Sequence, residues 1–212
     1  MTINPYPARG SGQKLDPFYP IVDSAAWVAR LLSADARLIQ LRIKNKDEEW
    51  VARETREALA LSRKAGATLV VNDHWRVAIA EGAEWVHLGQ EDLDTADLAA
   101  IRRAGLRLGV STHDHAELKR GLNAEPDYVA LGPIFPTISK EQAIAPHGFE
   151  RIAEWKRRVA PLPLCAIGGL DLERGKLCLA AGADMVAMIS DITQSADPEG
   201  RARQWIAATR RT

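Results

Sequence analysis

The sequence has few cysteines and no long apolar run. Cys165 and Cys178 are its only cysteines among 212 residues, and they lie in an apolar run and in a small-residue helical pattern. Buried, reduced thiols are expected there rather than a disulfide or a nucleophile, which favours the cytoplasm. No apolar stretch approaches the roughly 18 residues that span a membrane. Residues 1–14 are polar and lack the apolar centre of a signal peptide, so we expect a flexible lead-in.

An excess of charge of either sign is also missing. Lys and Arg together number 28, as do Asp and Glu, so the formal net charge is zero. Such a chain has no global field that would attract nucleic acid or an acidic membrane, and any anion-binding site must be local. We therefore expect small-molecule partners, no nucleic acid and no membrane. The sequence leaves the oligomeric state open, and a homodimer is compatible with it.

A recurring unit organises the chain: a small-residue segment with Gly leads directly into a short apolar run. Copies are found at Gly66, Gly82, Gly105 and Gly182. Gly at the end of a helix adopts the left-handed conformation, and a continuous apolar run is typical of a strand buried on both faces of a parallel sheet. Eight such runs are present, at residues 18–22, 38–41, 68–71, 85–88, 106–110, 128–131, 164–167 and 185–189.

The segments between these runs predict helices. Residues 48–64 and 149–159 have apolar side chains at spacings near three and four, the amphipathic helix pattern. Eight parallel strands alternating with helices can close into a (β/α)8 TIM barrel, and we predict this α/β fold as a single catalytic domain over residues 15–212. The alternative is an open doubly wound sheet. The barrel is favoured because no G-x-G-x-x-G follows the first strand and polar residues follow nearly every strand.

Active sites of such barrels are built at the carboxyl ends of the strands. After strands two to eight the sequence has, in order, Gln40, Arg42 and Lys44; Asn72 and Asp73; His87, Gln90, Glu91 and Asp92; Ser111, Thr112 and His113; Thr137 to Lys140; Gly168 and Gly169; and Ser190. These residues together predict an anion site that also contains carboxylates.

Arg42 and Lys44 are the candidate phosphate ligands. They alternate along an extended segment, so both side chains can point to the same side. Arg can grip phosphate oxygens through two parallel hydrogen bonds, and Lys adds a compact charge. The alternative is a solvated pair of charges at a strand end.

Asp73 and Asp92 are the candidate metal ligands. They follow neighbouring strands, so their carboxylates can converge although they are far apart in the sequence. Mg²⁺ typically takes one or two protein carboxylates and completes its octahedron with water and substrate phosphate oxygens. The alternative is that Asp73 caps the next helix and Asp92 starts a turn.

The last strands predict a second phosphate site. Gly168 and Gly169 let the backbone approach a ligand closely, as in the phosphate site common to barrels of this kind, and Ser190 could complete it; a tight strand-to-helix turn is the alternative. Residues 136–148 are too long for an ordinary connection, which indicates a lid. His113 and His115 have the H-x-H spacing of some zinc sites, for which His87 is the only plausible third ligand, and a zinc site is the less favoured interpretation.

Seven ordered motifs resemble those of the thiamine phosphate synthase family, from Tyr19 to about Ile192. They are Q-L-R-I-K at 40–44, V-N-D at 71–73, H-L-G-Q-E-D at 87–92, G-V-S-T-H at 109–113, G-P-I-F-P-T-I-S-K at 132–140, A-I-G-G at 166–169 and M-I-S at 188–190. The chain departs from the family pattern at Ile43, where many members have Glu, at Ser139, where the second Thr of the loop is usual, and over residues 141–147.

The resemblance implies a role for each of these positions. The residues implied to hold a pyrimidine diphosphate are Gln40, Leu41, Arg42, Ile43, Lys44, Asn72, Ser111 and Lys140, of which Arg42, Lys44, Ser111 and Lys140 would be catalytic. Asp73 and Asp92 would bind Mg²⁺. The residues implied to bind a thiazole phosphate are Thr137, Ile138, Ser139, Gly169, Ile189 and Ser190. The pyrimidine would ionise with loss of pyrophosphate, and the thiazole nitrogen would capture the resulting cation.

Two other functions remain open at this stage. A thiazole tautomerase, a relative on the same barrel, isomerises thiazole phosphate without a diphosphate and would use His113 as acid and base. A regulatory barrel that senses thiamine precursors would not need the charged set. Retention of Arg42, Lys44, Asp73 and Asp92 favours the synthase.

Overall fold

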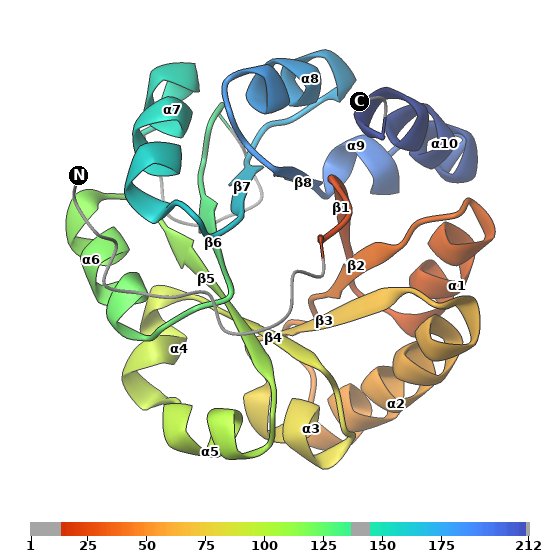
Figure 1. The fold of residues 1–212 in the computed structure, drawn as a ribbon. Coiled ribbons are helices and arrows are strands. Elements are labelled where there is room, and N and C mark those ends of the chain that lie inside the picture. Colours follow the sequence, from red (N-terminus) through yellow and green to blue (C-terminus); the bar gives the residue numbers. More distant parts are fainter. Residues whose placement is uncertain (1–13, 137–144, 211–212) are drawn as a thin grey trace.

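The computed structural model describes residues 14–136 and 145–210. The predicted lead-in, up to residue 13, lies outside the described residues, and so do the predicted substrate contacts Thr137, Ile138, Ser139 and Lys140. Eight parallel strands form a closed barrel in sequence order, with β8 paired to β1. Figure 1 shows the helices as an outer ring around it. The predicted (β/α)8 fold is confirmed.

The strand bounds agree closely with the apolar runs. The strands are β1 (Phe18–Val22), β2 (Leu38–Leu41), β3 (Thr68–Asn72), β4 (Trp85–Leu88), β5 (Arg107–Thr112), β6 (Tyr128–Leu131), β7 (Leu164–Ile167) and β8 (Met185–Met188). β5 starts after Leu106, whose N–H bonds to the Ile101 carbonyl at the end of the preceding helix, 3.1 Å away. It continues through Thr112 because Ser111 and Thr112 still pair with Ala130 and Leu131 of β6. β8 stops before Ile189, which adopts a helical conformation.

Helices follow every strand. They are α1 (Ala25–Ser33), α2 (Glu48–Ala65), α3 (Trp75–Ala80), α4 (Gln90–Thr95), α5 (Leu98–Arg103), α6 (His115–Asn123), α7 (Gly148–Val159), α8 (Leu172–Ala180), α9 (Ser190–Thr193) and α10 (Pro198–Thr209). Many begin at a capping side chain; Asp47 and Asp171, for example, each accept a hydrogen bond from the backbone N–H three residues on. The four glycines that predicted left-handed helix ends all have positive φ.

Strand side chains alternate between two apolar cores. One core fills the barrel and contains Tyr19, Trp85 and Tyr128. The other lies between the strands and the helices and contains Trp155 and Trp205. Because the side-chain period of a strand is two, every second residue of each strand points into the barrel. This alternation decides which residues at the strand ends can meet inside.

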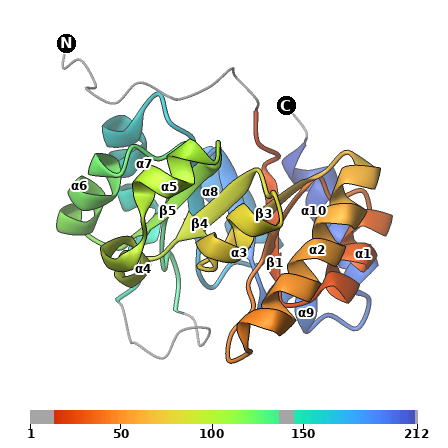
Figure 2. The same ribbon diagram turned by 90° about the horizontal axis from the view of Figure 1, so that it is seen from below.

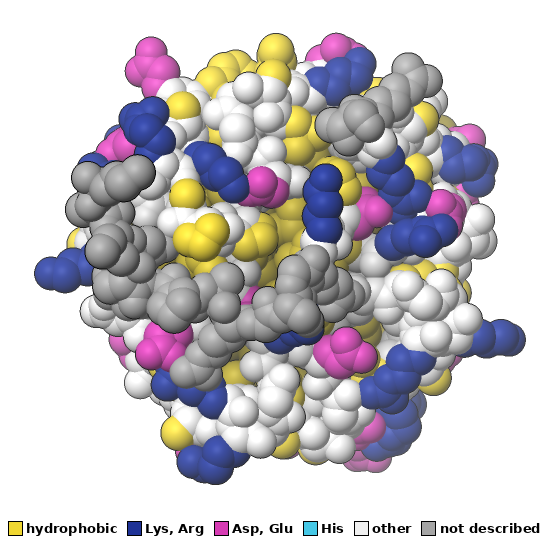
Figure 3. Space-filling model, in the orientation of Figure 1, with side chains coloured by type: hydrophobic (Ala, Val, Ile, Leu, Met, Phe, Trp, Pro, Cys, Tyr) yellow, Lys and Arg dark blue, Asp and Glu magenta, His cyan; other side chains and the backbone are white. Residues whose placement is uncertain are grey.

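Figure 2 shows the barrel after a 90° turn, with the orange β2–α2 connection and α9 at the lower side. Both segments follow the carboxyl end of a strand, so this is the end where active sites of the fold form. Figure 3 shows Lys and Arg side chains interspersed with Asp and Glu on the face seen in Figure 1. Among the described residues, no helix is long and apolar enough to cross a membrane.

Candidate active site

Four polar side chains meet near the carboxyl end of the barrel. Gln40, Asn72 and His87 are at most 5% exposed, and Asn72 is in register with His87. They are buried because the pleat turns them into the barrel. Ser111 on β5 joins them through a hydrogen bond between its Oγ and His87 Nε2, 2.8 Å apart. The structure thus brings three predicted substrate contacts, Gln40, Asn72 and Ser111, to one end of the barrel.

The predicted phosphate and metal ligands also meet. Lys44, after β2, donates a hydrogen bond from Nζ to Asp73 Oδ2. Asp73 follows β3 with φ of 64°, and its N–H bonds to the His87 carbonyl at 2.9 Å. Its carboxylate interacts directly with that of Asp92, in the first turn of α4. Neighbouring strands therefore place one ammonium group and two carboxylates at the same point.

The two carboxylates have opposite pKa shifts. Burial opposes ionisation of Asp73, but the hydrogen bond and charge of Lys44 outweigh it and lower the pKa below the usual value. Burial, and then the negative charge of Asp73, raise the pKa of Asp92 to about 6. This is the pattern of two carboxyl groups that share one site and resist double ionisation. A cation between them would favour both charged forms.

Neither aspartate is a helix cap. The N-cap of α3 is His74 and that of α4 is Gly89, and neither position has a capping side-chain hydrogen bond. His74 instead uses its ring Nε2 to contact the Ile43 carbonyl, 3.1 Å away. Asp92 does accept a hydrogen bond from the backbone of the N-cap residue Gly89, so its carboxylate contacts the start of α4 as well as Asp73.

The first motif alternates between core and site. Leu41 and Ile43 are 1% and 3% exposed and pack in the core outside the barrel. Arg42 is half-buried and Lys44 is exposed, on the other side of the segment. Because of this alternation, Leu41 and Ile43 can reach a ligand only through their backbone.

The histidines after β5 have carboxylate partners. His113 Nδ1 lies 2.6 Å from Glu117 Oε2, and His115 Nε2 lies 2.6 Å from Glu154 Oε1. The two rings therefore face different helices. In the described part of the chain, no group of three or more His, Cys, Asp or Glu side chains is arranged to hold a metal ion. A metal at Asp73 and Asp92 would need water and ligand oxygens to complete its shell.

The glycine pair after β7 makes a close backbone contact. Gly168 and Gly169 have φ of 103° and 63°, and a Cβ on Gly169 would lie 2.4 Å from the Pro136 carbonyl oxygen. An open depression of about 640 Å³ lies beside them. It is lined by Gly169, Leu170, Asp171, Arg174, Ser190, Asp191, Gln194, Ser195, Asp197, Arg201 and Gln204. Two arginines and the first turn of α9 thus adjoin the predicted thiazole phosphate contacts Gly169, Ile189 and Ser190.

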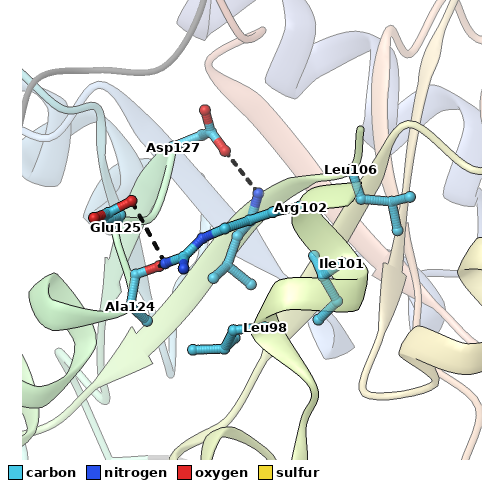
Figure 4. A pocket seen from close by; sticks show the side chains of 8 residues that line it. Leu98, Ile101, Arg102, Leu106, Ala124, Glu125 and Asp127 are labelled. Carbon is cyan, nitrogen blue, oxygen red and sulfur yellow. Dashed lines mark hydrogen bonds and ion pairs between the residues drawn. The ribbon is translucent and has the colours of Figure 1, made fainter. Parts of the chain in front are cut away.

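A second, much smaller cavity lies away from these residues. It measures about 20 Å³ and is lined by residues of α5, β5 and the segment before β6. Figure 4 shows Arg102 reaching over it to Glu125, with Leu98 and Ile101 beneath. Its volume suits about one water molecule, so we regard it as a packing defect with no substrate role.

A closed parallel barrel with ionic and polar side chains gathered at its carboxyl end defines the class: a (β/α)8 barrel with a candidate active site at the carboxyl ends of its strands. A family model described as thiamine monophosphate synthase matches residues 18–192. Thiamine-phosphate synthase of Rhizobium etli is 58% identical over 92% of this chain and 96% of its own length. That of Salmonella dublin is 51% identical over 90% and 87%. Thiamine phosphate pyrophosphorylase of Pyrococcus furiosus superposes with a TM-score of 0.82 at 27% identity, over 92% and 96% of the two chains.

The chain therefore belongs to the thiamine monophosphate synthase family. The predicted resemblance is confirmed, and with it the assignment to the transferases of thiamine biosynthesis. The structure adds residues that the motifs did not single out. Tyr19 and Tyr128 are hydrogen bonded to the group around His87, and Arg174 donates to the Gly169 carbonyl.

Proposed function

We propose that the chain couples 4-amino-2-methyl-5-(diphosphooxymethyl)pyrimidine with thiazole phosphate in a magnesium-dependent reaction that gives thiamine phosphate and pyrophosphate. The names of its relatives support the product. The observation that carries the proposal is the cluster of Lys44, Asp73 and Asp92 at the ends of neighbouring strands. A departing diphosphate needs positive charge, from a metal ion and from basic side chains, where its negative charge develops.

The pair of carboxylates fits a magnesium ion. Carboxylate oxygens are hard ligands of the kind that Mg²⁺ prefers, and the raised pKa of Asp92 beside Asp73 marks a repulsion that a divalent cation relieves. Asp73 and Asp92 would hold the ion. When bound, it neutralises charge on the diphosphate.

The basic residues bind the leaving group. Arg42 and Lys44 lie on the same side of one segment, and both would contact diphosphate oxygens. Lys140, which lies outside the described residues, would join them. Gln40, Asn72 and Ser111 would orient the pyrimidine at the mouth of the barrel, with Leu41 and Ile43 contributing backbone groups.

The thiazole phosphate would bind on the other side of the barrel mouth. Gly169, Ile189 and Ser190 would contact it, together with Thr137, Ile138 and Ser139 from outside the described residues. Gly169 and Ser190 line the open depression together with Arg174 and Arg201, and basic side chains beside such a hollow suit a phosphate.

The proposed reaction is a dissociative displacement. The bond between the pyrimidine methylene carbon and the diphosphate oxygen breaks, and its electron pair leaves with the diphosphate. The positive charge left on the methylene carbon is delocalised over the aminopyrimidine ring. The lone pair of the thiazole nitrogen then forms the new carbon–nitrogen bond. Arg42 and Lys44 favour the first step because they stabilise the charge that develops on the leaving group.

The cytoplasm is the proposed location. Cys165 and Cys178 are both buried and unpaired with each other, and burial raises the pKa of the Cys178 thiol to about 12. Buried thiols that stay protonated are inert structural residues, which suits a reducing compartment.

The test combines the purified chain with Mg²⁺ and both precursors. Thiamine phosphate and pyrophosphate are expected in equal amounts, and excess EDTA should stop their formation. Isomerisation of thiazole phosphate without any diphosphate substrate would identify a tautomerase instead. Binding of either precursor without turnover would identify a sensor.

Removal of either predicted metal ligand sharpens the test. Asp73→Asn and Asp92→Asn should each lower turnover at least about a hundredfold, or about 3 kcal/mol, because the diphosphate loses its metal. Asn is chosen because it tolerates the left-handed φ of Asp73. Asp94→Asn is the matched control, since Asp94 is 61% exposed and pairs with Arg120. Unchanged turnover in either site variant would remove the metal assignment.

A further inference from the structure

A buried chain of hydrogen bonds crosses the inside of the barrel. Gln40 Nε2 donates to the Tyr19 hydroxyl at 2.9 Å, and the Tyr19 and Tyr128 hydroxyls are 2.9 Å apart. The Tyr128 hydroxyl is 2.7 Å from His87 Nδ1, and His87 Nε2 is 2.8 Å from Ser111 Oγ. The chain therefore connects two predicted pyrimidine contacts, Gln40 and Ser111, through three residues that have no assigned role.

The two phenols are completely enclosed. Tyr19 is 1% exposed and Tyr128 is 0% exposed. Burial raises the pKa of both hydroxyls well above the ordinary value, so they stay neutral and can each donate one hydrogen bond. The Tyr128 ring also stacks on His87, with ring centroids 5.5 Å apart. Tyr128 therefore fixes the orientation of the His87 imidazole in two ways, through ring stacking and through the hydrogen bond to Nδ1.

β5 is shaped to admit the Tyr128 ring. Gly109 is paired in register with Tyr128, and a Cβ there would lie 2.2 Å from Tyr128 Cζ and 2.5 Å from its hydroxyl oxygen. No side chain fits in that space. Position 109 of the G-V-S-T-H motif is therefore glycine because the Tyr128 ring occupies the space that a side chain would need.

We propose that Tyr19 and Tyr128 are positioning residues, which hold His87 and so fix the Ser111 hydroxyl relative to Gln40. The proposal rests on the pyrimidine-binding role given above to Gln40 and Ser111. Because both phenols are enclosed, we place them behind Gln40 and Ser111 and not against the substrate. They make two separate polar contacts of the pyrimidine site into one rigid unit.

One direction gives every hydrogen of this buried chain an acceptor, and we assign that direction. Gln40 donates to Tyr19, Tyr19 donates to Tyr128, and Tyr128 donates to His87 Nδ1. A neutral imidazole then carries its hydrogen on Nε2 and donates it to Ser111 Oγ. Ser111 is left to donate its hydrogen to the ligand.

This direction matches one edge of an aminopyrimidine. Such an edge has an amino group that donates beside a ring nitrogen that accepts. In the proposed complex, the Ser111 hydroxyl would donate to the ring nitrogen and the Gln40 carbonyl oxygen would accept from the amino group. In a pyrimidine with a keto oxygen in place of the amino group, that oxygen would face the Gln40 carbonyl oxygen. Two acceptors would then lie against each other without a hydrogen, which weakens binding.

The test uses Tyr128→Phe and Tyr19→Phe, which remove one hydroxyl each and keep the ring. Each should lower kcat/KM for the pyrimidine diphosphate about tenfold, in line with one lost hydrogen bond in a buried network. KM for the thiazole phosphate should change less than about twofold. Thr209→Val is the control, because it removes an equally buried hydroxyl that bonds to Trp205 in α10. If KM for the thiazole phosphate rose as much as KM for the pyrimidine diphosphate, the hydroxyl would have a merely structural role, and the proposal would be wrong.

A double-mutant cycle locates the effect. If Tyr128 acts through Ser111, Tyr128→Phe should cost nothing further in a Ser111→Ala background. Additive losses would contradict the proposal.

The tautomer of His87 can be read without any turnover. Nitrogen-15 NMR of the unliganded protein should show the hydrogen on Nε2, and Tyr128→Phe should shift the tautomer population toward Nδ1. A hydrogen on Nδ1 in the unaltered protein would refute the stated direction. Because this measurement uses no substrate, it separates failure of the network from failure of the proposed reaction.

Discussion

Arg42 and Lys44 are separated by Ile43, which is buried in the outer core. This single apolar side chain anchors the segment and turns its two basic neighbours to the side of Asp73. Arg42→Lys keeps the charge but loses the planar fork that binds two phosphate oxygens at once. We expect KM for the pyrimidine diphosphate to rise about tenfold, which corresponds to about 1.4 kcal/mol of binding.

Steady-state kinetics with varied diphosphate checks this expectation. Arg37→Lys is the control, since Arg37 is 63% exposed and pairs only across the surface with Asp35 among the contacts described. An unaltered KM in Arg42→Lys would count against the bidentate contact.

At this scale the polar residues that follow a strand were easier to locate from the sequence than the tyrosines within strands. Asp73 and Asp92 are charged residues at strand ends, and charge there is conspicuous. Tyr19 and Tyr128 lie within apolar runs, where strands buried on both faces leave no polar alternation to separate inward from outward residues. Counting back by two from Ile21 and from Ala130 would have placed both tyrosines inside the barrel.

The loops after β6 and β7 are bonded to each other. The Phe135 N–H bonds to the Gly168 carbonyl at 3.0 Å. Arg174 of α8 donates to the Gly169 carbonyl at 2.8 Å and lies 4.6 Å from the centre of the Phe135 ring. One guanidinium group therefore fastens both loops beside the proposed thiazole phosphate contacts.

Arg174→Met should loosen these two loops. The aliphatic stem is kept, but the hydrogen bond and the contact of the cation with the ring are lost, so we expect Kd for thiazole phosphate to rise about two- to fivefold. Lys176→Met on the same helix is the control, because Lys176 pairs only with Glu173 among its described contacts. Titration calorimetry with thiazole phosphate measures the difference. Equal affinities in the two variants would exclude this role for Arg174.

Strands were easier to predict than the helices after them. Each apolar run is short and bounded by Gly or charge, which fixes its ends to within one or two residues. The helical layer after β4 is divided into α4 and α5, joined through Ala96 and Asp97, and Asp97 caps α5. Such six-residue helices carry too few turns for a periodic pattern, so sequence periodicity cannot predict them.

Closure of the whole barrel depends on contacts between the two ends of the chain. Trp205 of α10 is fully buried, stacks with Phe18 of β1 at 6.2 Å between ring centroids, and donates to Asp191 of α9 at 2.6 Å. A Cβ on Gly175 of α8 would lie 2.3 Å from its ring. The Trp205 side chain therefore contacts β1, α8 and α9 at once, at the place where the C-terminal helices cover the first strand.

Trp205→Ala should destabilise the entire domain. Loss of a large buried ring leaves a cavity and costs about 3–5 kcal/mol in the free energy of unfolding. Trp50→Ala, at a site 39% exposed, should cost about 1 kcal/mol or less. Urea unfolding followed by circular dichroism compares the two. A Trp205→Ala protein as stable as Trp50→Ala would show that the closure is held elsewhere.

The number of strands and their parallel order followed from the sequence, but the identity of the closing pair did not. The pairing of Phe18 with Val186 joins residues at opposite ends of the chain. Local patterns report periodicity and turns, and they contain no information on which distant edge a strand meets. The rule that barrels have no free edge supplied that step.

The seam between β1 and β8 also concerns synthesis on the ribosome. Arg210, next to the final described turn, bonds to Asp16 and Asp35 near the start of the chain. Until β8 has formed, one edge of β1 is unpaired, and until α10 has formed, Phe18 lacks the ring of Trp205. Unpaired strand edges and exposed apolar surface are where incomplete chains associate wrongly, so β1 is open to such contacts until β8 and α10 have both been synthesised.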